Sequence, residues 1–173
     1  MATQFNLATN QRAERKLLIT VAEWIEGTNT PTREILGRRT EDSSIEYNPD
    51  IETTTDILGI NYTDVNKTQP QQDFDPYLIL GGSKLGAKLN DIRRRNALSE
   101  LDQFTIYVIT AYIGNTSSGY ETEKHTGCTI LYTALGGDTN VNMPISVYLS
   151  NNSVTGTVNK LSDDFEFSAD VSV

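Results

Sequence analysis

Apolar side chains at every second position constrain what this chain can fold into more than any other feature of its sequence. Val141, Met143, Ile145, Val147 and Leu149 alternate with mostly polar residues, and Phe165, Phe167, Ala169 and Val171 do the same near the C-terminus. Successive side chains of a β-strand point to opposite faces of the sheet, so this period of two predicts half-buried strands. A similar pattern runs from Leu17 to Ile25. Short strands at this spacing predict an antiparallel sheet.

One segment has the period of a helix instead. Leu85, Leu89 and Ile92 fall at positions i, i+4 and i+7, and Ser83 is suited to cap the first turn, so we expect a helix over Ser83–Arg94. The sequence therefore predicts a mostly β fold, an antiparallel β-sandwich or barrel with one flanking α-helix. A chain of 173 residues can bury the core of one domain, and we expect residues 1–173 to form a single domain.

Two further expectations concern the segment between the first strand and the helix. Ser43–Tyr47 and Ile51–Leu58 have strand character, and Asn48–Asp50 suits a tight reversal, which predicts a β-hairpin over Glu41–Gly59. The stretch Asn61–Pro76 is polar and lacks a long apolar period, so we expect an extended loop there. Loops of this length are uncommon in compact domains unless they are functional or disordered, which makes it a candidate for assembly contacts.

The charges are segregated along the chain. The net charge is −9, and Glu41–Asp75 holds nine acidic residues against one base, Lys67, while Lys84–Arg95 is a compact basic stretch. Such asymmetry favours opposite-signed faces that meet between copies, although a solvated acidic surface is the simpler reading. The expected contacts between subunits come from the basic stretch and the polar loop: Lys84, Lys88, Arg93, Arg94, Arg95, Asn61, Asp64, Lys67 and Asp73.

Residues suited to catalysis or cofactor binding are scarce. His125 is the single histidine and Cys128 the single cysteine, whereas a structural zinc site normally uses four ligands. No Gly-x-Ser-x-Gly elbow and no phosphate-binding Gly-Lys-Ser/Thr ending occurs. No apolar stretch reaches the roughly 20 residues of a membrane-spanning helix. We therefore expect no enzyme activity, no metal, no cofactor and no membrane partner.

The order of several sequence blocks resembles that of bacteriophage major tail proteins. Arg38–Tyr47 continues into Asn48–Leu58 and Gly59-Ile60, followed by Asn61–Asp64 and Gln71–Pro76. Further agreement lies at Lys16-Leu17-Leu18, at Cys128–Gly137, which ends in Leu-Gly-Gly, and at Met143–Val147 before Gly156-Thr-Val. The resemblance covers roughly residues 15–160.

This resemblance implies a structural role in a virion tail. Major tail proteins are the tail tube subunits of tailed phages and prophages, particularly those of Gram-positive bacteria. Similar subunits build contractile tails, flexible tails and phage-like particles. They form hexameric rings that stack into a hollow tube for double-stranded DNA. The implied partners are other copies of the chain, a tape measure protein, a tail terminator, and baseplate or tail-tip proteins, assembled in the host cytoplasm. The N-terminal arm Met1–Arg15 and the loop Asn61–Pro76 are then expected to link ring to ring.

If the chain forms such a tube, we expect Glu46, Glu52 and Asp56 to line its central channel. In the predicted hairpin they fall on the face away from Ile45, Tyr47 and Ile57, which would face the sandwich core. A rival interpretation pairs these carboxylates with Arg93–Arg95 of a neighbouring subunit. An alternative function is a carbohydrate-binding β-sandwich, whose aromatic platform would come from Trp24, Tyr107, Tyr112, Tyr120 and Tyr148.

Overall fold

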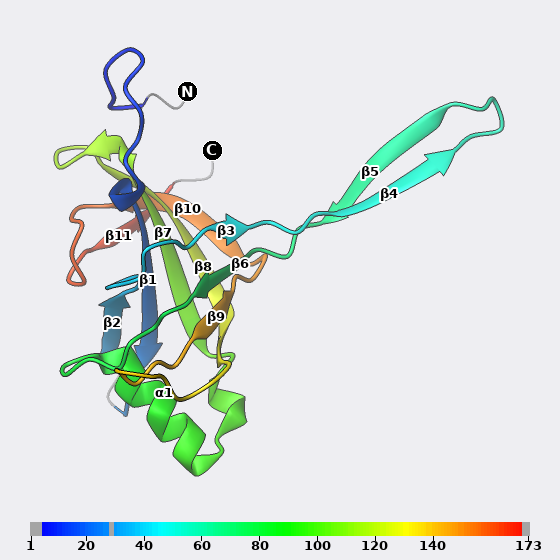
Figure 1. Ribbon diagram of the computed structural model, residues 1–173. Coiled ribbons are helices and arrows are strands. Elements are labelled where there is room, and N and C mark those ends of the chain that lie inside the picture. The colour runs from blue at the N-terminus through cyan, green and yellow to red at the C-terminus, as the bar shows by residue number, and fades with distance from the viewer. Residues whose placement is uncertain (1–4, 28–29, 171–173) are drawn as a thin grey trace.

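The computed structural model describes residues 5–27 and 30–170, in which the chain forms antiparallel strands, one α-helix and two short 3-10 turns. The strands are β1 (Leu18–Ile25), β2 (Pro31–Ile35), β3 (Ile45–Glu46), β4 (Asp50–Thr55), β5 (Asn61–Lys67), β6 (Gln71–Phe74), β7 (Phe104–Asn115), β8 (Gly119–Tyr132), β9 (Ile145–Tyr148), β10 (Ser153–Val158) and β11 (Phe167–Ala169). The helix α1 is Lys84–Arg95, and the 3-10 turns are Arg15–Leu17 and Leu98–Glu100. The predicted mostly β fold with one flanking helix is confirmed (Figure 1).

The long strand β8 joins two branches of the main sheet. The strand order is β2-β1-β7-β8-β9-β6-β3, and β10 pairs with β8 and with β11. Residues Tyr120–His125 of β8 pair with β10, whereas Thr129–Tyr132 pair with β9. One branch is therefore β2-β1-β7-β8-β10-β11 and the other is β8-β9-β6-β3. The outer strands of the first branch, β2 and β11, leave its two edges open within the described residues.

The main hydrophobic core lies between these branches and under α1. The apolar stripe of the helix, Leu85, Leu89 and Ile92, is fully buried there. It packs with side chains of both branches: Trp24, Phe104, Ile106 and Val108 from the first, and Phe74, Ile130, Ile145 and Val147 from the second. The described part of the chain contains no helix with the length and hydrophobicity needed to cross a lipid bilayer.

A second, smaller core covers the opposite face of the first branch. It contains Val21, Tyr107, Ile109, Val158 and Phe165, and Phe165 lies in the segment that links β10 to β11. Alternate residues of β7 thus enter different cores, because Ile106 and Val108 face one side and Tyr107 and Ile109 the other. Burial on both faces explains why this strand is almost continuously apolar in sequence.

The strands β4 and β5 form a hairpin that projects away from the body of the protein (Figure 1). They pair only with each other, from Asp50 opposite Lys67 to Thr55 opposite Asn61, and every residue of both strands is exposed. Strands of this length extend about 20 Å at ~3.3 Å per residue. The hairpin therefore contributes little to the core and is available for contacts with another molecule.

Two expectations from the sequence are wrong in this region. Asn48–Asp50 does not close a hairpin, because β3 pairs with the distant strand β6 and only β4 and β5 form the hairpin. The predicted loop Asn61–Pro76 is mostly strand, since it contains β5 and β6. A long-range backbone hydrogen bond explains the first difference. Gln69 N donates to Tyr47 O at 2.9 Å and extends the pairing of β3 with β6, two segments far apart in sequence.

The described start of the N-terminal arm lies against its own subunit. The backbone N–H of Asn6 donates to the carbonyl of Tyr112 at 3.0 Å, and its side-chain amide donates to the carbonyl of Gly114 at 2.6 Å. The ring of Phe5 lies 5.9 Å from that of Tyr112. Residues 1–4 of the predicted arm, and Val171 of the C-terminal alternation, lie outside the described residues. A role of this arm between rings stays a prediction.

Candidate functional site

The tip of the β4–β5 hairpin presents three apolar side chains to solvent. Asp56 shapes the turn, because its Oδ1 accepts hydrogen bonds from the backbone N–H groups of Leu58 at 2.8 Å and Ile60 at 2.9 Å. The bond from Ile60 is the main cause that holds the pKa of Asp56 below its ordinary value. Ile57 is 102% exposed, Leu58 77% and Ile60 49%. Keeping such side chains in water is unfavourable, so the tip is suited to bind a partner.

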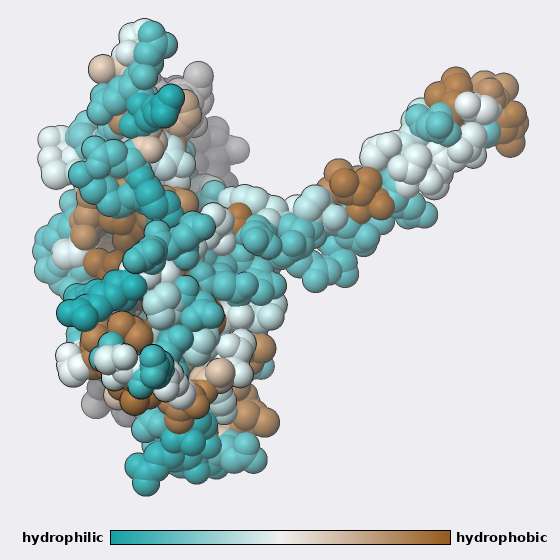
Figure 2. All heavy atoms as spheres, viewed as in Figure 1, coloured by the Kyte–Doolittle hydropathy of each residue, from teal (hydrophilic) through white to brown (hydrophobic). Residues whose placement is uncertain are grey.

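The register gives the hairpin one uncharged face and one acidic face. Cross-strand partners share a face, so Ile51 lies beside Val65, and Thr53 lies beside Thr63 on the same side. Thr55 and Asn61 continue this uncharged face toward the tip. The opposite face places Glu52 directly beside Asp64, with Thr54 and Tyr62 next along the ribbon. Figure 2 shows the β4–β5 hairpin with hydrophobic residues gathered at its tip and again near its middle.

The acidic residues predicted to line a channel do not share one face of a hairpin. Glu46 lies on β3, Glu52 on the acidic face of β4, and Asp56 in the turn with its carboxylate engaged by the backbone. The predicted inward orientation of Ile57 is wrong, since this side chain is at the exposed tip, and Tyr47 is also mostly exposed. Ile45 does pack against the main core, as expected. That the three carboxylates line a channel stays a prediction.

Much of the basic charge on α1 is neutralised within the subunit. Lys88 Nζ lies 2.7 Å from Glu100, and Arg95 contacts both Glu100 at 2.9 Å and Asp91 at 2.7 Å. Hydrogen bonds from Arg95 and Lys88 lower the pKa of Glu100 to about 2. These contacts explain why Lys88 and Arg95 are less available to a neighbour than their position on the helix suggests.

The other predicted contact residues lie at several places on the surface. Lys84 is 3.6 Å from Asp163, Arg93 donates to the side chain of Asn90 at 2.9 Å, and Arg94 has no salt bridge within the described residues. Asn61, Asp64 and Lys67 lie on β5 in the hairpin, and Asp73 lies on β6 where it accepts from Gln71. The structure thus places three of the predicted contact residues on the projecting β4–β5 hairpin.

The N-terminus of α1 is occupied by a carboxylate of the same chain. Glu34 on β2 accepts from the backbone N–H groups of Lys84 at 2.5 Å and Leu85 at 2.9 Å, and from the hydroxyl of Ser83 at 2.9 Å. Ser83 in turn accepts from the N–H of Gly86 at 3.1 Å, which confirms it as the N-cap. A carboxylate here satisfies free N–H groups and favours the positive end of the helix dipole, so this contact fastens the helix to the sheet.

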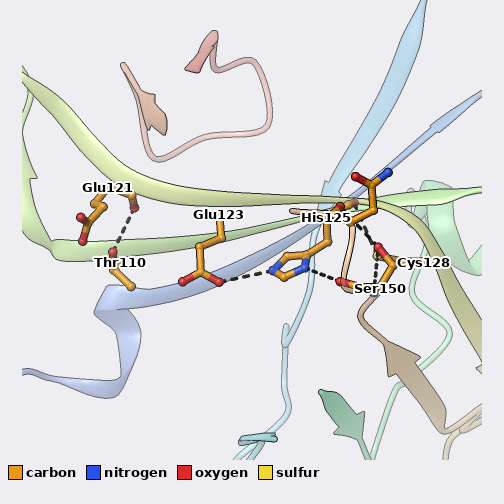
Figure 3. A network of polar contacts seen from close by, with 7 residues as sticks. Thr110, Glu121, Glu123, His125, Cys128 and Ser150 are labelled. Atoms are coloured by element: carbon orange, nitrogen blue, oxygen red, sulfur yellow. Dashed lines mark hydrogen bonds and ion pairs between the residues drawn. The ribbon is translucent and has the colours of Figure 1, made fainter. Parts of the chain in front are cut away.

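His125 and Cys128 do not form a catalytic pair. The Sγ atom of Cys128 contacts the backbone carbonyl of His125 at 3.5 Å, while the imidazole contacts Glu123 and the carbonyl of Ser150 (Figure 3). Burial raises the pKa of the Cys128 thiol, which disfavours a nucleophilic thiolate. No group of three or more His, Cys, Asp or Glu side chains suited to hold a metal occurs in the described part of the chain.

The aromatic residues considered for a carbohydrate platform are also separated. Trp24 is buried in the main core, whereas Tyr107 is buried in the second core on the other face of the sheet. Tyr112 packs against Phe5 near the N-terminal arm, and Tyr148 lies on β9. Trp24 and Tyr107 are therefore unavailable for an exposed platform, and Tyr120 packs against the second core.

The same fold occurs in a solved particle. No protein-family model and no curated protein matches the chain. A chain of the anti-feeding prophage cap, which terminates the tube, matches with a TM-score of 0.52 at 9% identity over 88% of this chain and 95% of that one. The two chains share a fold.

Two further solved structures match with lower scores. A chain of the sheath–tube complex of PVC, an extracellular contractile injection system, has a TM-score of 0.47 at 12% identity, with 80% of this chain and 88% of that chain covered. A chain of the anti-feeding prophage baseplate has a TM-score of 0.44 at 12% identity, with 90% and 100% covered.

Sequence reasoning missed the hairpin tip as the most exposed apolar site. The signal was present in Asp56–Gly59, since an Asp at the start of a turn and a Gly with positive φ, here +77°, favour a tight reversal. In Asn61–Lys67 most side chains at both odd and even positions are polar, so neither face of the strand carries an apolar stripe. A strand exposed on both faces gives no apolar period, so β5 resembled a loop.

Proposed function

We propose that this chain is a structural subunit that assembles with copies of itself into rings, and that the rings stack into the hollow tube of a phage tail or phage-like particle. The projecting β4–β5 hairpin is the observation that carries the proposal. Its apolar tip and uncharged face are exposed in the isolated subunit and suit burial against a second copy. The shared fold with the prophage cap chain supports the same conclusion at the level of architecture.

The open edges of the sheet supply a second kind of contact. Unpaired edge strands present free N–H and C=O groups, and pairing β2 of one subunit with β11 of the next would protect both edges. Repeating one such heterologous contact around an axis closes a ring. We expect a hexameric ring, with the hairpin reaching the neighbouring ring, and a tape measure protein, a terminator and a tail-tip or baseplate protein as further partners.

The charge of the chain suits the passage of DNA. An acidic wall repels phosphates and so avoids the binding that a basic wall would cause. The net charge of −9 and the acidic residues Glu46 and Glu52 fit this role, whereas the carboxylate of Asp56 serves mainly to close the turn. In this proposal the chain has no catalytic activity and needs no cofactor.

Electron microscopy of two purified proteins tests the proposal. The first is the wild-type chain, which should form rings and, at higher concentration, tubes. The second has Ile51–Val65 replaced by a two-residue Asn-Gly turn, and its body should fold normally because β4 and β5 pair only with each other. We expect this variant to form no tubes while its thermal unfolding matches that of the wild type. Wild-type protein that stays monomeric at high concentration would refute the proposal.

A further inference from the structure

Both ring nitrogens of His125 face hydrogen-bond acceptors. Nδ1 lies 2.8 Å from the backbone carbonyl oxygen of Ser150, and Nε2 lies 3.3 Å from the carboxylate Oε2 of Glu123 (Figure 3). A carbonyl accepts only, and so does an ionised carboxylate. A neutral imidazole has a single N–H, so the lone pair of its other nitrogen would face an acceptor. The imidazolium has two N–H groups and donates to both acceptors. The geometry therefore favours the doubly protonated ring.

The surroundings of His125 supply one charge, and its sign is negative. On the neighbouring strands the ring lies beside Ile106 of β7 and Ser153 of β10, neither of which titrates. On its own strand the titratable groups in contact with His125 are Glu123 and the buried thiol of Cys128. Lys124 faces the other side of the sheet, over the ring of Tyr107, and Glu121 lies two residues beyond Glu123. The side chain of His125 is 8% exposed, and this burial opposes the charge, but the bonds to Glu123 and Ser150 outweigh it and raise the pKa of the ring.

The bond to Glu123 acts on the carboxylate as well as on the ring. It lowers the pKa of Glu123 below its ordinary value, so this carboxylate keeps its negative charge beside the imidazolium. The Tyr47 hydroxyl, on the segment that follows β3, lies near this carboxylate. Burial is the main cause that raises the pKa of Tyr47 and the charge of Glu123 is the second, so Tyr47 titrates far above the range of the histidine. The only group of this cluster that changes charge near neutral pH is therefore His125 itself.

The carbonyl held by His125 belongs to the turn that carries the chain from β9 to β10. Further bonds fasten this turn to β8: Ser150 Oγ donates to the carbonyl of Thr126 at 2.5 Å, and Thr126 N donates to the carbonyl of Asn152 at 3.0 Å. The side-chain amide of Asn152 also donates to Thr126 Oγ1 at 2.8 Å. The strands on either side of the turn pair with different halves of β8, so the turn fixes where the two branches of the sheet separate.

We propose that His125 is a pH-dependent latch: its imidazolium fastens the turn 150–152 to β8. When the ring loses one proton, the remaining N–H stays on Nε2 facing the charged carboxylate of Glu123, so Nδ1 presents a lone pair to the Ser150 carbonyl and the turn is loosened. Because the folded pKa is raised, the latch contributes its full stability below the unfolded value of about 6.5. The contribution is lost as the pH rises through the folded pKa. The device resides within one subunit and does not depend on the proposed assembly.

The single histidine makes the proposal directly testable by NMR on the full chain labelled with ¹⁵N at the imidazole. We expect both ring nitrogens to be protonated at pH 6, and the ring to titrate at a higher pH than in the urea-unfolded chain. Exchange of the Thr126 amide proton, which bonds to Asn152 across the turn, should rise with pH through that titration by more than base catalysis explains. A ring with one protonated nitrogen at pH 6, or one that titrates at or below the unfolded value, would overturn the latch.

Glu123→Gln is the matched variant. A glutamine amide can donate to Nε2 of a neutral ring, so both nitrogens are satisfied without the second proton. We expect the ring of this variant to titrate at a lower pH than in the wild type, and Thr126 exchange to lose its extra pH dependence. Unchanged titration in Glu123→Gln, with an otherwise native spectrum, would show that the carboxylate does not hold the proton and would also overturn the proposal.

Discussion

Charging the hairpin tip should block assembly without unfolding the subunit. In the variant with both Ile57→Asp and Leu58→Asp, the replaced side chains are 102% and 77% exposed, so folding loses almost no buried surface. We expect the free energy of unfolding to change by no more than about 0.5 kcal/mol. In an assembled contact, full burial of each side chain is worth about 1.5–3 kcal/mol, or roughly 3–5 kcal/mol for the two at these exposures. At ~1.4 kcal/mol per factor of ten, association should weaken on the order of 100-fold to 4000-fold.

Sedimentation velocity over a series of concentrations measures this shift, and thermal unfolding of the monomer checks the fold. Thr54→Asp is the control, because Thr54 is exposed on the acidic face of the same hairpin and the substitution also introduces an aspartate, here with one added charge instead of two. We expect the control to assemble like the wild type. If the tip variant assembles at wild-type concentrations, or if Thr54→Asp is impaired as strongly, the apolar tip is not the contact and the reasoning fails.

Three further substitutions test the account of the fold. Glu34→Ala removes the acceptor for three groups at the start of α1 and should lower the free energy of unfolding by about 2–4 kcal/mol in denaturant titration. Glu100→Gln should flatten acid unfolding between pH 4.5 and about 2, because the depressed pKa of Glu100 contributes stability that is present above pH 4.5 and lost as the pH falls. Gly114→Ala should destabilise the β7–β8 turn by roughly 1–3 kcal/mol or more, since its φ is +93° and a Cβ would lie 2.1 Å from the carbonyl of Gly119.

Buried periodicity was predictable from the sequence because burial selects side chains on one face. The helix over Ser83–Arg94 occurs as Lys84–Arg95, and its predicted stripe is fully buried. Of the alternating residues Val141 to Leu149, all but Val141 are buried. The strand β9 is much shorter than this alternation, because Pro144 precedes it and offers no N–H for a ladder bond. Burial was therefore predicted better than hydrogen bonding.

Pairing between distant segments was not predictable from local pattern. Asn48-Pro49-Asp50 has the composition of a tight turn, yet Asn48 Nδ2 donates to the carbonyl of Gln69 at 3.2 Å, and the chain continues into β4 instead of reversing. The first half of β8 was also missed, because Glu121 and Glu123 interrupt its apolar pattern. Long-range backbone pairing decides both places, and a window of neighbouring residues does not contain that information.

The candidate site was predicted only in part for the same reason. Charge segregation pointed to contacts between copies. However, Lys88 and Arg95 form salt bridges to Glu100 of the same subunit, across the turn that follows α1, and a count of charges along the sequence does not predict such pairs. Ile57 was assigned to the core because it fits an alternating pattern, whereas the hydrogen bonds of Asp56 place Ile57 in a turn. Local turn chemistry overrode the strand period here.

Cryo-electron microscopy of the assembled wild-type chain is the decisive test of the proposed tube. We predict a hollow tube of stacked rings in which the tip residues Ile57, Leu58 and Ile60 are buried against a neighbouring copy. We further predict that the uncharged face of the hairpin is covered while Glu52 and Asp64 stay accessible. Particles that remain compact monomers at high concentration, or a tube whose hairpin tips lie free in solvent, would contradict this prediction.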